Sequence, residues 1–298
     1  MDPRRRALLA FLAAAAAIGP ALAQDRIMSK QIPSTREPLP VIGVGTWQTF
    51  DVGADNAARA QLRDVLKLLK GNVVDSSPMY GSSESVAGDL IAGLGTREQL
   101  FMATKVWTRG RADGIAQMET SFKRLRVERM DLMQIHNLVD VETHTKTLLE
   151  MKSKKKIRYL GITHYTSSAY AEVERWLKTR QYDFLQINYS LGERESENRL
   201  LPLAQELKVA VIANRPFAEG AMFRRVKGKP LPPWAAELGI ASWAQYFLKW
   251  IVSHPAVTCA IPGTGNPKHM ADNLGAGRGP LPDAAARKRM AEHFDSSS

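Results

Sequence analysis

The stretch "VVDSSPMYG" at residues 73–81 begins like a buried strand and ends like a turn. Two valines before an acid are typical of a short apolar strand, and Pro78 and Gly81 mark the turn that follows. Asp75 and Tyr80 therefore lie just past a strand end, five positions apart. Each residue also has an ordinary structural use, because an acid can cap a turn and an aromatic ring can pack at the edge of a core.

Seven more apolar runs of this kind alternate with helical patterns along the chain. The eight predicted strands cover 41–45, 72–76, 100–106, 130–136, 158–163, 184–189, 209–214 and 257–263. The predicted helices cover 55–70, 83–94, 113–126, 141–155, 167–179, 196–208, 234–253, 267–275 and 282–294. Eight such units predict a single-domain (β/α)8 TIM barrel, whose strands are buried on both faces. An open doubly wound sheet is disfavoured, because "GVGTWQT" at 43–49 lacks the dinucleotide pattern G-x-G-x-x-G.

The first 23 residues have the pattern of an export signal. Three arginines at 4–6 precede the apolar run "ALLAFLAAAAAIG", and "ALA" at 21–23 offers small residues for cleavage. Paired arginines suit the twin-arginine route. We therefore expect a signal peptide at 1–23, the barrel at 24–298 and a periplasmic protein with no stable membrane insertion after cleavage. A retained anchor is the alternative, although the apolar run is short for a membrane span.

Charge and cysteine content exclude several classes of function. The net charge is +11, of which the first 23 residues carry +2 and the remaining chain +9. The basic cluster "KSKKKIR" at 152–158 is typical of the solvated end of a helix. It lacks the interleaved aromatic rings that favour nucleic-acid binding. Cys259 is the only cysteine. We therefore predict no internal disulfide, no metal site and no nucleic-acid partner.

Four polar side chains are expected to meet at the carboxyl ends of neighbouring strands, where barrels hold their active sites. Asp75 lies at the end of the second predicted strand and Tyr80 follows it, Lys105 lies on the third, and His136 ends the fourth. Tyrosine has an ordinary pKa of about 10 and donates protons poorly at neutral pH, so we expect Lys105 to lower that pKa. Asp75 would hold the lysine, and His136 would orient a substrate oxygen. Taken singly, Lys105 could be a surface residue and His136 a buried structural histidine, but together the four suit proton delivery to a carbonyl.

These motifs resemble those of the aldo-keto reductases, and the chain looks like a bacterial, exported member. The resemblance rests on "VVDSSPMYGSSESVAGDLI", "ATKVW", "MDLMQIHN", "YLGITHY", "FLQINYS" and "IPGTGNPKHMADNLGA", and it covers nearly all of 24–298. It implies a TIM barrel that transfers hydride from NADPH, less often NADH, to a small-molecule carbonyl substrate. By motif, the catalytic residues would be Asp75, Tyr80, Lys105 and His136.

The resemblance also implies a set of cofactor contacts. They are Thr46, Trp47, Thr163, His164, Gln186, Asn214, Arg215, Pro216, Phe217, Gly263, Thr264, Gly265, His269, Asp272 and Asn273. Three features depart from the family pattern. His164 replaces an amide. Asn214 stands where an aromatic ring commonly stacks on the nicotinamide, so Arg215 or Phe217 would form that wall. Gly263 and His269 stand where many NADPH-preferring members have Lys and Arg, so NADH is also possible.

Two further functions stay open at this point. A nucleotide-binding sensor or binding protein of the same fold, with little turnover, would fit an exported chain, because no free NADPH pool is expected outside the cytoplasm. A barrel hydrolase would need paired carboxylates or a metal at the strand ends, and Asp75 beside Lys105 argues against it. The basic loop at 217–233 suits either phosphate or a plain surface. The sequence does not predict the substrate or the oligomeric state.

Overall fold

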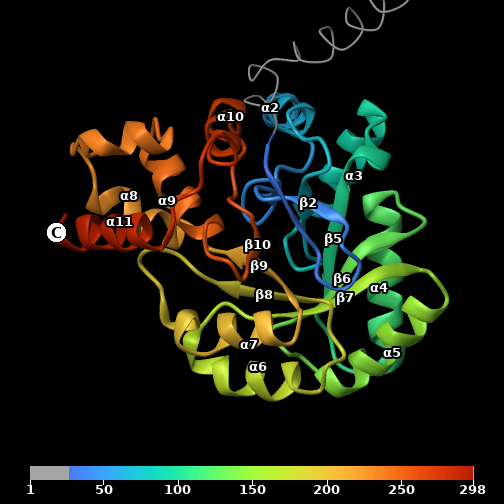
Figure 1. Ribbon diagram of the computed structural model, residues 1–298. Helices are drawn as coiled ribbons and strands as arrows, with labels where there is room; N and C mark the ends of the chain where they lie inside the picture. Colours follow the sequence, from blue (N-terminus) through green and yellow to red (C-terminus); the bar gives the residue numbers. More distant parts are fainter. Residues whose placement is uncertain (1–26, 298) are drawn as a thin grey trace, which may run out of the picture.

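The computed structural model describes residues 27–297. Eight parallel strands, β3 to β10, pair in sequence order and form a nearly closed barrel (Figure 1). They are β3 Val44–Gly45, β4 Val73–Asp75, β5 Phe101–Val106, β6 Met130–His136, β7 Ile157–Thr163, β8 Phe184–Asn188, β9 Ala210–Asn214 and β10 Val257–Ala260. All eight correspond to predicted strands. The predicted (β/α)8 barrel is therefore confirmed.

The barrel closes between its first and last strands. Gly43 N donates to Ala260 O over 2.8 Å, and Ala260 N donates to Val41 O over 2.9 Å. Parallel bridges also join Ile42 to Ala260 and Gly45 to Gly263. These contacts bring the segment after β3 beside the segment after β10, although more than 200 residues separate them in the sequence.

Helices surround the sheet (Figure 1). The α-helices are α2 Asn56–Lys67, α3 Ser83–Leu94, α4 Arg111–Leu125, α5 Val141–Ser153, α6 Tyr170–Leu177, α7 Leu200–Glu206, α8 Ala221–Arg225, α9 Trp243–Val252, α10 Pro267–Gly275 and α11 Ala284–Ser296. The 3-10 helices are η1 Arg97–Gln99, η2 Ser167–Ala169, η3 Glu195–Asn198, η4 Ala218–Gly220 and η5 Pro233–Leu238. Side-chain caps fix several starts. Asp55 accepts from the backbone of Ala57 and Ala58 before α2, and Asn266 accepts from Lys268 N before α10.

Four details differ from the sequence prediction. The single helix predicted at 196–208 is η3 followed by α7, because Arg199 between them has non-helical backbone angles, with φ −146° and ψ −51°. The single helix predicted at 234–253 is η5 followed by α9, because Gly239 takes a left-handed φ of 62° and Ser242 caps a new helix. The segment 217–233 contains the short helix α8 rather than only loop. A hairpin of β1 Ser29–Gln31 and β2 Pro38–Pro40 precedes the barrel, and it was not predicted. Its Ile32 and Leu39 pack against the side chains inside the barrel.

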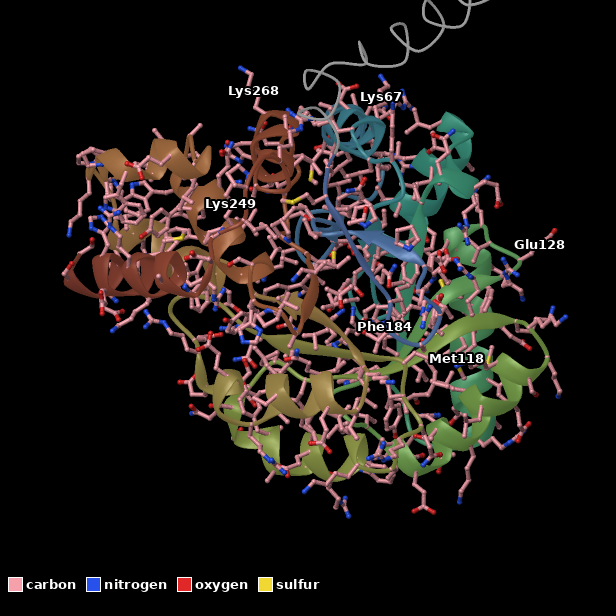
Figure 2. The ribbon with its side chains drawn as sticks, viewed as in Figure 1. Lys67, Met118, Glu128, Phe184, Lys249 and Lys268 are labelled. Carbon is pink, nitrogen blue, oxygen red and sulfur yellow. The ribbon has the colours of Figure 1, made fainter. Side chains whose placement is uncertain are left out.

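The inner face of the barrel changes from apolar to polar along the strands. Its lower part is a separate apolar cluster with members Val73, Phe101, Leu132, Tyr159, Phe184, Ala210, Ile212, Cys259 and Ile261. Figure 2 shows Phe184 near the middle of the molecule, whereas Lys67 and Lys268 point outward from α2 and α10. Because side chains alternate along a strand, residues at even spacing beyond this cluster also face inward. They are Asp75, Lys105, Gln134, His136, Thr163, Gln186 and Asn214.

Between residues 27 and 297, no helix is long and apolar enough to cross a membrane. The predicted export signal at 1–23 lies outside the described residues.

Candidate active site

An ion pair forms the base of the site. Lys105 Nζ lies 2.5 Å from Asp75 Oδ2 and donates a second hydrogen bond to Ser76 O over 2.8 Å. The Lys105 side chain is fully buried and Asp75 is 2% exposed. β4 and β5 are neighbours in the sheet, so residues at the ends of the two strands are held within contact distance. A buried ammonium of this kind is tolerated because the carboxylate and a carbonyl oxygen satisfy it.

Tyr80 lies above this ion pair. The Lys105 ammonium is 5.1 Å from the centre of the Tyr80 ring, and the ring meets the His136 imidazole edge-on at 5.8 Å. The turn before α3 sets this position, because Gly81 has a left-handed φ of 56°. A side chain at Gly81 would place its Cβ 2.2 Å from Asp51 Oδ2. Asp51 Oδ1 in turn accepts from Ser82 N over 2.8 Å, so the turn is tied to the segment after β3.

The pKa values of Tyr80 and Lys105 only partly follow the expectation from the sequence. Burial raises the pKa of Tyr80, and the nearby Lys105 offsets only part of that rise. For Lys105, burial alone would lower the pKa, but the attraction of Asp75 and Tyr80 outweighs it and raises the pKa. Lys105 thus acts to lower the pKa of Tyr80 as expected, but burial outweighs it, so the expected net lowering is wrong. Tyr80 carries its proton at neutral pH, as a proton donor must.

His136 is neutral in this environment. Burial, together with the charge of Lys105, lowers its pKa to about 2. Its Nδ1 lies 3.1 Å from the hydroxyl oxygen of Ser77, in the turn after β4. When that hydroxyl donates to Nδ1, the ring proton is on Nε2, which can donate a hydrogen bond into the site.

Gln186 lies against Asp75. Its Nε2 donates to Asp75 Oδ1 over 2.9 Å, and its Oε1 accepts from Thr163 Oγ1 over 3.3 Å. Gln134 on β6 also donates from Nε2 to Asp75 Oδ1, over 3.1 Å. Two residues predicted to hold the cofactor, Gln186 and Thr163, thus form one hydrogen-bonded chain that ends at the carboxylate.

The β9 loop, residues 214–220, holds the four predicted contacts Asn214 to Phe217. Asn214 Nδ2 donates to His164 O over 3.1 Å, while Arg215 pairs with Glu219 at 2.9 Å and Glu193 at 3.4 Å. Two buried atoms of this loop, Asn214 Oδ1 and Arg215 Nε, have no hydrogen-bond partner among residues 27–297.

The two residues predicted to replace the missing aromatic wall point in different directions. Phe217 packs against Phe223 and Phe247, with ring centres 4.8 and 6.4 Å away, so its ring belongs to an aromatic cluster over α9. The Arg215 guanidinium lies 5.9 Å from the centre of the Tyr165 ring. Pro216 between them is buried.

His164 is half-buried after β7, with its ring stacked on Tyr165 at 5.6 Å. Its Nδ1 accepts from the backbone N–H groups of Tyr165 and Thr166 at 3.0 and 3.3 Å. These donors place the ring proton on Nε2 in the neutral form, so the imidazole can donate to a ligand but cannot also accept from it.

The remaining predicted contacts lie at the junction of the first and last strands and on α10. Thr46 is buried, with Oγ1 donating to Ser76 Oγ over 2.8 Å, whereas Trp47 is 45% exposed. Gly263 is exposed beside Gly45, and Thr264 Oγ1 accepts from Asn266 N. Of the other predicted contacts, Gly265 and Asp272 are half-buried, His269 is exposed and Asn273 is buried.

Asp272 and the basic residues of the loop after β9 have protein partners. Asp272 accepts from Ser242 Oγ and from Gln245 Nε2, each at 2.7 Å, so it links α10 to α9. Arg225 and Lys229 donate to the backbone oxygens of Asp295 and Ser297 at 2.6 and 2.5 Å. These two basic side chains hold the C-terminal helix to the loop.

Sequence reasoning missed three residues of the site, Ser76, Ser77 and Gln134. The serines follow Asp75 directly, and hydroxyls at a strand end could have signalled a polar site. Gln134 has the clearer signal, because a glutamine two positions before His136 on the same strand must face the same side.

A cavity of 680 Å³ lies elsewhere, at the amino end of the barrel, and is lined by residues such as Lys70, Arg97, Glu98 and Arg129. Active sites of barrels lie at the opposite end, so this cavity is separate from the site. Among residues 27–297, no group of three or more His, Cys, Asp or Glu side chains is arranged to hold a metal ion.

Comparison with known proteins identifies the family. The model of the aldo/keto reductase family matches residues 41–289. The chain is 30% identical over 247 residues to methylglyoxal reductase YeaE of Escherichia coli, covering 79% of this chain and 84% of that one. It is 27% identical to aldo-keto reductase str7 of Strobilurus tenacellus, covering 74% and 77%. A crystal structure of an aldo/keto reductase from Klebsiella pneumoniae with NADP and acetate superposes with a TM-score of 0.75, at 24% identity, covering 90% and 96%. The chain belongs to the aldo/keto reductase family.

Proposed function

We propose that the protein reduces an aldehyde or ketone to an alcohol with NADPH, using Tyr80 as the proton donor. The observation that carries this proposal is the fully buried Lys105, paired with Asp75 at 2.5 Å directly below the Tyr80 ring. Family membership and the NADP named with the Klebsiella pneumoniae structure support the cofactor.

The side chains around Tyr80 perform separate parts of the reaction. NADPH, when bound, supplies the hydride that the carbonyl carbon takes up. Tyr80 transfers its hydroxyl proton to the carbonyl oxygen, and Lys105 stabilises the phenolate that this transfer leaves. Asp75 keeps Lys105 charged. Neutral His136 donates a hydrogen bond to the same oxygen and so orients the carbonyl next to Tyr80. Solvent then returns a proton to Tyr80.

The strand-end loops contain groups that fit a nicotinamide nucleotide. The carboxamide carries both a donor and an acceptor, and the β9 loop offers the matching unpaired atom Asn214 Oδ1. His164 offers an Nε2–H donor from the neighbouring segment after β7, whose backbone oxygen at His164 accepts from Asn214 Nδ2. Lys268, adjacent to His269 on α10, is exposed and supplies positive charge for the 2'-phosphate.

The test uses purified protein, NADPH and NADH titrated by fluorescence, and a panel of carbonyls that includes methylglyoxal, the substrate named for the Escherichia coli relative. We expect NADPH to bind and to be oxidised with at least one carbonyl. Tyr80→Phe should lower kcat by about 10²- to 10⁴-fold, the usual size of a general-acid contribution, with the NADPH Kd within about twofold. Binding without oxidation by any carbonyl would favour a nucleotide sensor, and an active Tyr80→Phe protein would contradict the role of Tyr80.

We also propose that residues 1–23 direct export to the periplasm by the twin-arginine route. The support is the arginine and alanine pattern of the sequence. We expect the periplasmic fraction to contain protein that begins at Gln24, as read by N-terminal sequencing. Replacing Arg4, Arg5 and Arg6 with lysine should keep the protein in the cytoplasm at full length. Full-length protein confined to the cytoplasm in the unaltered strain would contradict the proposal.

A further inference from the structure

Gln134 occupies an unusual place for a polar side chain. It is fully buried on β6, and its register partner on β5 is Lys105. On the other side it pairs with Gly161 of β7. A Cβ on Gly161 would lie 3.3 Å from Gln134 Cγ, so the glycine leaves the space inside the barrel into which Gln134 extends.

The two oxygens of Asp75 have different partners. Oδ2 faces Lys105 at 2.5 Å, whereas Oδ1 accepts from Gln134 Nε2 at 3.1 Å and from Gln186 Nε2 at 2.9 Å. Amide donors on one oxygen and an ammonium on the other fix the rotation of the carboxylate. Without the two amides, Oδ1 would be a buried charged oxygen with no donor, which is costly.

The amide orientation of Gln134 also follows from this contact. Turning the amide over would place Gln134 Oε1 against the carboxylate, so Nε2 must face Asp75. Gln134 Oε1 is then buried without a hydrogen-bond partner in the described part of the chain. An apolar residue of similar volume would avoid that cost, and the inner cluster below it is hydrophobic at Leu132 on the same strand and at Phe101 on β5. A buried polar group that is only half satisfied is typical of a functional position.

We propose that Gln134 is a positioning residue for the reduction: with Gln186 it holds the Asp75 carboxylate so that Oδ2 stays on Lys105 beneath Tyr80. This inference rests on the proposed function. Gln134 acts through Asp75 and Lys105 and touches neither substrate nor cofactor. Gln186 makes the same contact and its Oε1 also accepts from Thr163 Oγ1, whereas Gln134 Oε1 has no partner among the described residues.

The first test compares Gln134→Leu with Met133→Leu, a buried substitution on the same strand that faces the outer core. Gln134→Leu should lower kcat about tenfold, with the KM for the carbonyl and the Kd for NADPH within twofold of the unaltered protein. Met133→Leu should leave all three within twofold. Gln186→Leu should lower kcat similarly and also weaken NADPH binding. A Gln134→Leu kcat within twofold of the unaltered value would overturn the proposal.

The second test uses the pH profile of Gln134→Glu. A glutamic acid donates to Asp75 only while protonated, so kcat should fall as pH rises through its ionisation, at a lower pH than the loss that ionisation of Tyr80 causes in the unaltered protein. A packing role would give no such fall at lower pH. A profile with the same shape as that of the unaltered protein would count against the proposal.

The third test does not depend on turnover. A double-mutant cycle for unfolding combines Gln134→Leu with Asp75→Asn, because an amide at position 75 accepts more weakly than a carboxylate. We expect the two changes to be coupled by at least fivefold in the unfolding equilibrium constant. Coupling within twofold would contradict the contact even if the protein reduces carbonyls. If the protein binds NADPH but reduces no carbonyl, the proposed function fails, and this cycle still decides whether Gln134 holds Asp75.

Discussion

Two regions at the same end of the barrel differ in how fully their buried polar atoms are paired. In the strand-end cluster, Asp75, Tyr80, Lys105 and His136, the charges are paired and the aspartate is held from both oxygens. In the β9 loop, residues 214–220, Asn214 Oδ1 and Arg215 Nε are buried without partners among the described residues. The loop also contains three non-glycine residues with left-handed φ, Arg215 at 50°, Ala218 at 47° and Glu219 at 51°.

The contrast teaches which half of the site is ready before a ligand binds. Proton delivery depends on atoms held within about 0.5 Å of the productive geometry. Here strand ends place Asp75, Lys105 and His136, while the turn tied to Asp51 places Tyr80. The loop keeps strained backbone and unpaired polar atoms, both of which cost free energy that a bound nucleotide would offset. We therefore expect changes in the cluster to affect kcat and stability, and changes in the loop to affect cofactor affinity.

The largest effect should come from Lys105→Met. It leaves the Asp75 carboxylate buried without its cation, which should lower the free energy of unfolding by about 3–5 kcal/mol and abolish measurable reduction. Adding Asp75→Asn removes the unpaired charge, so the double variant should recover part of that stability and none of the activity. Urea unfolding and carbonyl-dependent NADPH oxidation measure the two outcomes. If Lys105→Met and the Lys105→Met, Asp75→Asn double variant were equally stable, the unpaired Asp75 charge would not be the cause of the lost stability.

The cluster was also the part of the site most accessible to prediction. Apolar strand runs such as "MDLMQIH" identify the barrel because its strands are buried on both faces, and strand ends then place Asp75, Lys105 and His136 together. The contacts that depend on tertiary packing were not predictable. The hairpin β1–β2 has only three residues in each strand and is held by packing of Ile32 and Leu39 inside the barrel.

Two other misses have physical causes. Lys105 was expected to lower the pKa of Tyr80, but that expectation ignored burial, which outweighs the charge. The partners of the β9 loop depend on which side chains lie across from it. Arg215 pairs with Glu193, which is 22 positions earlier in the chain, and no local pattern predicts that pair.

The next largest effect should come from Arg215→Ala in the loop. Its unpaired Nε is the kind of donor that a bound anionic or amide group would satisfy, and hydrogen bonds of charged groups contribute about 1.5–3 kcal/mol. We expect the NADPH Kd to rise about tenfold or more. The ion pairs of Arg215 are partly exposed, so the free energy of unfolding should change by less than about 1 kcal/mol. Fluorescence titration and urea unfolding separate these outcomes. A large loss of stability with unchanged affinity would reverse the assignment of the loop.

A smaller effect should appear in the pH dependence of the cluster. The pKa of His136 is lowered to about 2 by burial, so between about pH 2 and 6.5 the unfolded chain binds a proton that the folded protein does not. Stability therefore falls as pH decreases through that window, by at most about 1.4 kcal/mol per pH unit. His136→Asn should remove this contribution. Urea unfolding of the unaltered protein and of the His136→Asn variant, each at pH 7 and at pH 5, measures the difference. An equal decrease in both proteins would mean that His136 takes up its proton while folded.

The smallest effect should come from relieving strain in the loop. Ala218 has a φ of 47°, a conformation that glycine adopts without a steric penalty, so Ala218→Gly should raise the free energy of unfolding by up to about 1 kcal/mol. Ala116→Gly, an exposed position within α4, is the matched control and should lower it by about 0.5–1 kcal/mol, because glycine is unfavourable in a helix. Opposite signs for the two variants, measured by thermal unfolding, would locate stored strain in the β9 loop. The same sign for both would mean that the loop carries none, and the contrast with the strand-end cluster would then rest on the unpaired atoms of Asn214 and Arg215 alone.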